Sequence, residues 1–278
     1  MLTAYDYPTA RAASTHGIDI TLVGDSLAQV CLGYSSTTSL TLDEMLHHCR
    51  AVARGTSAPL LVADMPFGSY YTGNEDTIRA AVRMVQEGHV EAVKLEGGSE
   101  IASRVQALTT IGIPVMAHVG LLPQRHTALS GYRVQGRTAK AARSILHSAL
   151  ALEEAGAFSI VLEAIPASLA AYITSRLKVP TIGIGAGPGC SGQVLVWDDV
   201  MGTWAGHKAK FVRRFGDVKS EVEHGVKAYA SAVRDGSFPH HEKEGYMMDN
   251  GEIEKLLEME NDKEWTWNPP QPSSLMST

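Results

Sequence analysis

The sequence predicts a single (β/α)₈ barrel, and three features support this fold class. Short apolar runs rich in Val, Ile, Leu and Ala alternate with amphipathic stretches of helical length, as in parallel sheets buried on both faces. Eight such runs occur in 278 residues, an ordinary length for one barrel. Ionisable or glycine-rich residues close strand after strand at the same end, which indicates a site on one rim of the barrel.

The predicted strands can be placed in order along the chain. The first is the short run Leu2–Tyr5. The others lie near 18–25, 60–66, 92–97, 114–119, 159–164, 180–185 and 193–198. A doubly wound open sheet is the alternative, but no G-x-G-x-x-G turn follows the first strands, which counts against its dinucleotide-binding form.

Capping signals place helices between these strands. Thr41 and Glu44 form a capping box at the start of an amphipathic stretch. Asn74 and Thr138 are each positioned to cap a further helix. The alternation of strand and helix signals therefore continues along most of the chain.

Two regions differ in composition. We expect residues 1–245 to form the barrel domain and 246–278 to form an acidic, then Pro- and Ser-rich tail that is disordered. The segment 251–264 could form a short helix, but a solvated tail is favoured. Residues 242–264 contain nine acids and three lysines, so they carry the whole net charge of −6.

The composition excludes several classes of function. There is no basic stripe of the kind that binds nucleic acid. No apolar run reaches the roughly 18 residues of a membrane span. Three cysteines without close pairing indicate a reducing compartment and no structural zinc. The remaining candidates are enzymes or binding proteins that act on small molecules.

Acidic residues at neighbouring strand ends form a candidate metal site. Asp25 lies in VGDSL, Asp64 in ADMPF and Glu96 in KLEGG. Mg²⁺ typically takes one or two protein carboxylates and leaves its other positions to water and substrate. Each aspartate alone could instead cap a helix or form a loop ion pair. Ser26, beside Asp25, is better suited to hold a substrate carboxylate than to act as a nucleophile.

Three further ionisable residues occupy strand ends. Lys94 and Glu96 share one face of a strand, and a lysine buried there needs a protein or substrate carboxylate beside it. His118, in PVMAHVG, is either a hydrogen-bonding residue of the interior or a base. Glu163, in VLEAIP, has apolar neighbours of the kind that raise a carboxylate's pKa and make it a better base near neutral pH.

Two glycine-containing segments complete the candidate site. The long, polar connection 121–137 has no periodicity and reads as a functional loop. The turn GIGAG at 183–187 allows close approach of the backbone to a ligand, although taken alone it is weak evidence.

Taken together, these motifs resemble one family. TAYDY (3–7), VGDSL (23–27), ADMPF (63–67), KLEGG (94–98), AHVGLLPQ (117–124), GYRVQGR (131–137), LEAIP (162–166) and GIGAG (183–187) occur in its order and spacing. The sequence is similar to ketopantoate hydroxymethyltransferases, also called 3-methyl-2-oxobutanoate hydroxymethyltransferases, from residue 3 to about 239. The resemblance implies a barrel of the phosphoenolpyruvate-binding superfamily type.

The resemblance also implies an activity. The family transfers a one-carbon unit from 5,10-methylenetetrahydrofolate to 3-methyl-2-oxobutanoate, giving 2-dehydropantoate on the way to pantothenate. Mg²⁺ is its usual metal. By matching motif, Asp25 and Asp64 would ligate Mg²⁺, with Glu96 completing the sphere directly or through water. The keto acid would contact Asp25, Ser26, Asp64 and Lys94.

The resemblance also implies catalytic roles. Glu163 resembles the proton acceptor, and His118 and Lys94 would stabilise developing charge. Mg²⁺ on the 2-oxo group would favour the enolate that attacks the one-carbon unit. Small molecules are the expected partners. The resemblance implies a homo-oligomer, with the family's decamer as a candidate state. Neither nucleic acid nor a membrane is expected as a partner.

Family members usually carry a helix and most of a strand before TAYDY, so we expect a truncated first strand here, from a truncated gene model or an alternative start. The cellular compartment is left open. The sequence favours the cytoplasm, and a mitochondrial location would apply if a presequence is missing. One rival is a Mg²⁺-dependent lyase or mutase acting on 2-oxo acids, but its K-[KR]-C-G-H signature is absent. Another is a non-catalytic partner subunit, although every expected active-site residue is present.

Overall fold

The protein is built around one parallel sheet of eight strands in consecutive order, β1 to β8. The computed structural model describes residues 1–128, 131, 133–203, 206, 208–249, 251–262 and 264–267. The strands are β1 Leu2–Thr3, β2 Ile20–Val23, β3 Leu60–Asp64, β4 Ala92–Glu96, β5 Val115–Gly120, β6 Ser159–Glu163, β7 Thr181–Ile184 and β8 Gly192–Gln193.

The two ends of the sheet meet. Leu2 of β1 forms a parallel bridge with Leu195, just after β8, and Thr3 N donates to Leu195 O at 3.3 Å. Consecutive strand order without a reversal excludes the doubly wound alternative. The fold is therefore of the α/β TIM-barrel type, as the sequence predicts.

The prediction for the last strand is wrong beyond Gln193. A strand was expected over 193–198, but helix α8, Trp197–Met201, begins within that range. Asp198 and Asp199 lie in its first turn, where acidic side chains favour a helix. The Trp197 N–H also donates to Thr3 Oγ1 at 2.8 Å, which holds the start of the helix against the first strand.

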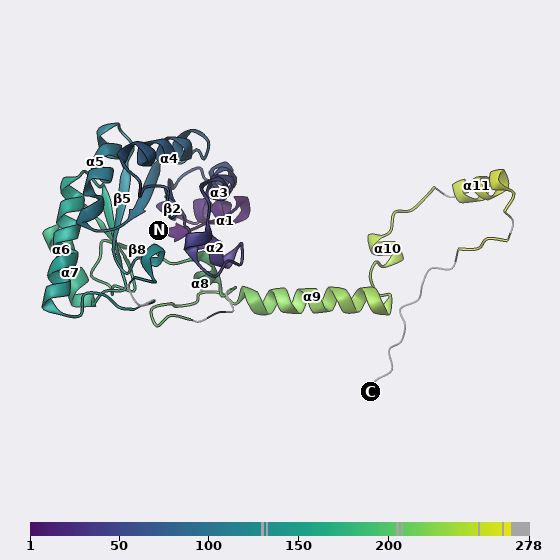
Figure 1. Ribbon diagram of the computed structural model, residues 1–278. Coiled ribbons are helices and arrows are strands. Elements are labelled where there is room, and N and C mark those ends of the chain that lie inside the picture. The colour runs from purple at the N-terminus through teal and green to yellow at the C-terminus, as the bar shows by residue number, and fades with distance from the viewer. Residues whose placement is uncertain are drawn as a thin grey trace. The chain divides into compact units, whose positions relative to one another are not determined.

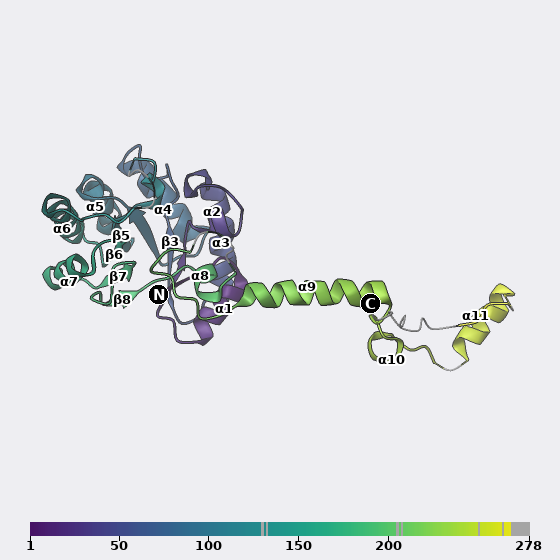
Figure 2. The same ribbon diagram turned by 90° about the horizontal axis from the view of Figure 1, so that it is seen from below.

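Helices surround the sheet (Figures 1 and 2). The longer ones are α1 Tyr7–Thr15, α3 Leu42–Gly55, α4 Asn74–Gln86, α5 Ala102–Thr110, α6 Ala139–Glu154 and α7 Ala167–Arg176. Shorter ones are α2 Leu27–Val30, α8, and the 3₁₀ turns η1 Thr37–Ser39, η2 Ser99–Ile101 and η3 Pro123–Arg125.

The capping predictions are confirmed for two helices and wrong for one. Thr41 and Glu44 form the expected capping box of α3, and Thr138 caps α6 through Ala141 N. Asn74 is the first residue of α4 and does not cap it, because Gly73 occupies the cap position. Helix α1 was not predicted.

The core has two layers. An outer cluster fills the space between the sheet and the helices. A smaller inner cluster takes one residue from each strand from β2 to β7 and one after β8: Leu22, Val62, Ala92, Met116, Val161, Ile182 and Val194. Since side chains alternate along a strand, the residues two positions later face the same interior. This inner apolar layer is the floor of the site described below.

The chain divides into two compact units, Met1–Gly216 and Asp217–Thr278, so residues 217–245 group with the second unit rather than with the strands. The second unit contains α9 Val218–Asp235, α10 His241–Glu244 and α11 Glu252–Glu260, none of which has a buried residue. The acidic segment thus forms the short helix that was considered less favoured. The Pro- and Ser-rich end from 268 lies outside the described residues. In the described ranges no helix is long and apolar enough to cross a membrane.

Candidate active site

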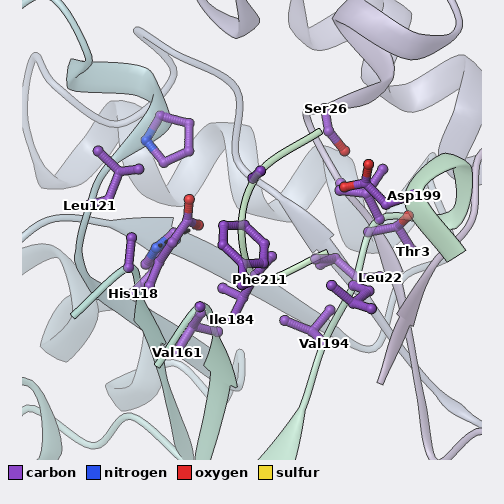
Figure 3. Close-up of a pocket in the computed structure, with 18 of the residues that line it drawn as sticks. Thr3, Leu22, Ser26, His118, Leu121, Val161, Ile184, Val194, Asp199 and Phe211 are labelled. Carbon is purple, nitrogen blue, oxygen red and sulfur yellow. Dashed lines mark ion pairs between the residues drawn. The ribbon is translucent and has the colours of Figure 1, made fainter. Parts of the chain in front are cut away.

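Ionisable side chains meet directly above the inner apolar layer. Asp64, Lys94, His118 and Glu163 each stand two residues after a member of that layer, so all four face the barrel interior. They line a cavity of about 890 Å³ at the carboxyl ends of the strands. Figure 3 shows His118 and Leu121 on one side of this cavity and Thr3, Ser26 and Asp199 on the other.

The strand register sets which side chains are neighbours. Asp64 pairs with Lys94 between β3 and β4, and Glu96 pairs with His118 between β4 and β5. All four of these residues are buried. Because paired residues on adjacent strands lie side by side, the strand register brings Asp64 beside Lys94 and Glu96 beside His118.

Lys94 is the cation at the centre of the cluster. Its Nζ lies 2.7 Å from Asp64 Oδ1 in an ion pair with both side chains buried. Burial lowers the pKa of Lys94, but the carboxylates around it, Asp64 foremost, outweigh this and raise it. The prediction that a buried lysine here needs a carboxylate beside it is thus confirmed.

His118 connects Lys94 to Glu163. Its Nδ1 lies 3.2 Å from Lys94 Nζ, and its Nε2 lies 3.3 Å from Glu163 Oε2. Burial and the nearby charge of Lys94 lower the pKa of His118, so the ring is neutral. An ammonium group can only donate, so Nδ1 accepts and the ring proton is assigned to Nε2, facing Glu163. The alignment of the Nε2 contact falls short of a hydrogen bond.

Asp25 and Asp64 adjoin one another across β2 and β3. The Asp25 N–H donates to Asp64 Oδ2 at 2.9 Å, and both side chains are buried. Burial and the charge of Asp64 raise the pKa of Asp25 to about 7. Burial and the charge of Asp25 likewise raise the pKa of Glu96. The cluster therefore sets four carboxyl groups, those of Asp25, Asp64, Glu96 and Glu163, against the one ammonium group of Lys94.

Gln124, in the turn η3, is a site residue that the sequence analysis missed. Its side chain is 3% exposed, and its Nε2 donates to Asp25 Oδ2 at 2.9 Å. Its backbone N–H donates to Glu96 Oε2 at 3.0 Å. The only sequence signal was its place in AHVGLLPQ, since a glutamine in a polar loop does not by itself indicate burial.

Ser26 lies at the opposite side of the cavity from His118 (Figure 3). Its Oγ is 3.0 Å from Tyr5 OH, which also accepts a hydrogen bond from Thr3 Oγ1 at 2.7 Å. Ser26 precedes α2 but makes no side-chain cap there. In the cavity wall its hydroxyl instead contacts Tyr5, which follows the first strand.

Glu163 is the least buried acid of the cluster, with 14% of its side chain exposed. The next residue, Ala164, has a left-handed backbone with φ of 46°. Two backbone hydrogen bonds hold it: its N–H donates to Ile184 O, and its carbonyl accepts from Gln135 N. The connection 121–137 thus fixes the chain just after Glu163.

The glycine turn at the end of β7 packs against the protein's own side chains and also lines the cavity through Gly185 and Gly187. The sequence analysis expected Gly185 to allow approach of a ligand. An added Cβ there would lie 2.7 Å from Phe211 Cδ1, so the glycine makes room for that ring, which lines the cavity. Phe211 was not predicted, because the segment before it carries no strand or helix signal.

Comparison with known proteins identifies the family of this chain. The family model described as ketopantoate hydroxymethyltransferase matches residues 1–241. The chain belongs to this family. A 3-methyl-2-oxobutanoate hydroxymethyltransferase of Oleidesulfovibrio alaskensis is 54% identical over 239 residues, which cover 86% of this chain and 83% of the relative. One from Heliobacterium modesticaldum is also 54% identical, covering 86% and 87%.

Solved structures agree on the fold. Phosphonopyruvate hydrolase in complex with oxalate and Mg²⁺ has a TM-score of 0.57 at 16% identity, covering 94% of this chain and 90% of that one. 2,3-Dimethylmalate lyase has a TM-score of 0.56 at 19% identity, covering 94% and 91%. In this ketopantoate hydroxymethyltransferase family member, the sequence-predicted residues thus surround one cavity of a TIM-barrel-type fold.

Proposed function

We propose that the protein transfers a hydroxymethyl group from 5,10-methylenetetrahydrofolate to 3-methyl-2-oxobutanoate, giving 2-dehydropantoate. The observation that carries the proposal is the chain of contacts from Asp64 through Lys94 and His118 to Glu163, beside two further buried carboxylates in one cavity. Family membership supplies the reaction, since the relatives carry its name. One water must supply the hydroxyl oxygen of the product.

The charge of the cluster supports a bound divalent cation. Burial first, and then the neighbouring acids, raise the pKa values of Asp25 and Glu96, and a bound cation would favour their charged forms. No three His, Cys, Asp or Glu side chains of the described ranges converge as a complete metal site. Mg²⁺ needs only one or two protein carboxylates, because it keeps water and substrate oxygens as its other ligands. Asp25 and Asp64 would bind Mg²⁺, and Glu96 would bind it directly or through a water molecule.

Bound Mg²⁺ would act as a Lewis acid toward the 2-oxo group of the keto acid. Ser26 and Lys94 would hold the substrate's oxygens from two sides of the cavity. A lysine ammonium and a serine hydroxyl are both donors, as a carboxylate and a ketone require. We expect this arrangement to place C3 of the keto acid toward Glu163.

Glu163 would remove the proton from C3. Its side chain is more exposed than those of the other three acids. The electron pair left by the proton forms the enolate, whose C3 would then bond to the methylene carbon. The bonds of that carbon to the folate nitrogens would break, water would supply the hydroxyl group, and tetrahydrofolate would leave. The Nε2 proton of His118 faces the accepting carboxylate, and the charge of Lys94 lies behind the ring. Both would stabilise charge that develops next to them.

The remaining cavity would take the folate. Leu121, Arg133 and Val134 of the long connection line it, and so does Phe211. Apolar walls suit the ring systems of a folate and limit access of water to the enolate. We also propose a homo-oligomer, as the family resemblance implies.

Substrate choice tests the proposal. The purified protein would be given 3-methyl-2-oxobutanoate with methylenetetrahydrofolate and, separately, phosphonopyruvate, oxaloacetate or 2,3-dimethylmalate. We expect product only from the first mixture. Cleavage of one of the other acids, without transfer to the first, would assign the chain a lyase or hydrolase activity instead.

A further inference from the structure

Gln124 joins two carboxylates that repel each other. Its Nε2 donates to Asp25 Oδ2 at 2.9 Å, and its backbone N–H donates to Glu96 Oε2 at 3.0 Å. One residue therefore contacts acids that come from the ends of two different strands. The second oxygen of each acid, Asp25 Oδ1 and Glu96 Oε1, receives no hydrogen bond from Gln124.

The orientation of the Gln124 amide is determined by its other partners. Its Oε1 accepts from Tyr70 OH at 2.7 Å and from Tyr71 OH at 3.3 Å. A tyrosine hydroxyl can donate or accept, but the carbonyl of Met65 can only accept, so Nε2 must face Met65 O and Asp25 while Oε1 faces the tyrosines. Nε2 uses its second proton on Met65 O at 3.0 Å.

The tyrosines are themselves held in place. Arg104 of α5 donates from Nε to Tyr70 O at 3.0 Å and from Nη2 to Tyr71 O at 3.3 Å. The Tyr70 ring is fully buried, and the Glu96 N–H approaches its hydroxyl at 3.3 Å. The amide of Gln124 thus has partners on both sides and little freedom to turn.

We infer that Gln124 is the positioning residue that holds Asp25 and Glu96 at the spacing a divalent cation requires. Without these two donors, the buried carboxylates would turn apart or away from the cavity. With them, one oxygen of each is fixed and the other remains for a cation or its water. This inference rests on the proposed function, and it concerns an interaction through the carboxylates, since Gln124 is not among the residues that line the cavity.

Loss of a partner of this kind typically costs 10–100-fold in metal affinity. Gln124→Met keeps the volume and removes the amide that donates to Asp25, while the backbone N–H that donates to Glu96 remains. We expect its affinity for Mg²⁺ alone, measured by calorimetry on the full chain, to fall at least about tenfold. Gln106→Glu, on the exposed face of α5, alters a glutamine outside the cavity and is the control. Its Mg²⁺ affinity should match that of the wild type.

Tyr70→Phe provides a second variant that keeps Gln124. It removes the hydroxyl that orients the amide, and we expect a smaller loss of Mg²⁺ affinity. Because both residues act through one amide, the double variant should bind Mg²⁺ no more weakly than Gln124→Met alone. A lowered melting temperature with wild-type Mg²⁺ affinity in both single variants would mean a packing role and overturn the inference.

The outcome can be separated from that of the proposed function. A wild type that binds Mg²⁺ but does not convert 3-methyl-2-oxobutanoate would overturn the function and leave the positioning role in place, provided that Gln124→Met still weakens binding. A wild type that turns over the keto acid, beside variants with unchanged Mg²⁺ affinity, would overturn only the positioning role.

Discussion

Glu163 Oε2 lies 3.3 Å from His118 Nε2, at the boundary between the buried charges and the open cavity. The His118 side chain is 2% exposed and that of Glu163 is 14% exposed. The Glu163 carboxylate can therefore contact a ligand in the cavity, while the His118 ring is shielded from solvent. This relationship separates the base of the proposed reaction from the acids proposed to hold a metal.

Removal of divalent cations should stop the reaction reversibly. The buried carboxyl groups around Asp25 would repel an anionic substrate unless a cation were bound beside them. We expect turnover of 3-methyl-2-oxobutanoate to fall to background in EDTA and to return when Mg²⁺ is added in excess. Full activity after exhaustive chelation would contradict the proposed metal.

Lys94→Met should destabilise the fold. It removes the partner of Asp64 and leaves a buried carboxylate uncompensated, at a cost of about 3–5 kcal/mol. Urea denaturation in EDTA measures this free energy of unfolding. Lys140→Met, at an exposed position of α6, should stay within about 0.5 kcal/mol of the wild type. Equal stability of the two variants would show that the buried pair is not formed.

Gly120→Ala should impair the site by displacing the backbone next to Glu163. Gly120 has a φ of 101°, and an added Cβ would overlap the carbonyl oxygen of Glu163. We expect loss of most of the turnover, because β5 and β6 must move apart next to the base. Gly225→Ala, in α9, meets nothing within 4 Å and should retain activity. Normal activity of Gly120→Ala would contradict the described register.

Thr41→Ala should affect stability alone. Thr41 Oγ1 accepts from Glu44 N at 3.3 Å in the capping box of α3. Its loss should cost about 1 kcal/mol in thermal or urea unfolding. Turnover should not change, and Thr41→Ser, which retains the hydroxyl, should behave as the wild type. A loss of turnover without a loss of stability would count against this assignment.

Much of the fold could be predicted because its signals are local. Apolar runs, and the capping box of Thr41 and Glu44, depend on neighbours in sequence. The acids and bases at strand ends could be predicted as a group, since parallel strands bring their carboxyl ends to one rim. The predicted strand after Gln193 was wrong, because a hydrogen bond from Trp197 N–H to distant Thr3 and acids in the first turn favour a helix there.

The unpredicted parts of the site depend on contacts between distant segments. Gln124 is buried only because Tyr70 and Asp25, far away in sequence, surround it. Phe211 reaches the cavity only because Gly185 leaves room for its ring. Neither residue type indicates such a role by composition, periodicity or spacing.

The exchange of the C3 hydrogen of 3-methyl-2-oxobutanoate in D₂O, with Mg²⁺ and without folate, tests the central claim most directly. It follows proton removal by NMR and needs no second substrate. We predict exchange by the wild type and a loss of about 10²–10⁴-fold in Glu163→Gln, as for removal of a general base. Exchange by Glu163→Gln at the wild-type rate, in a protein that folds and binds Mg²⁺, would contradict the assignment of Glu163 as the base.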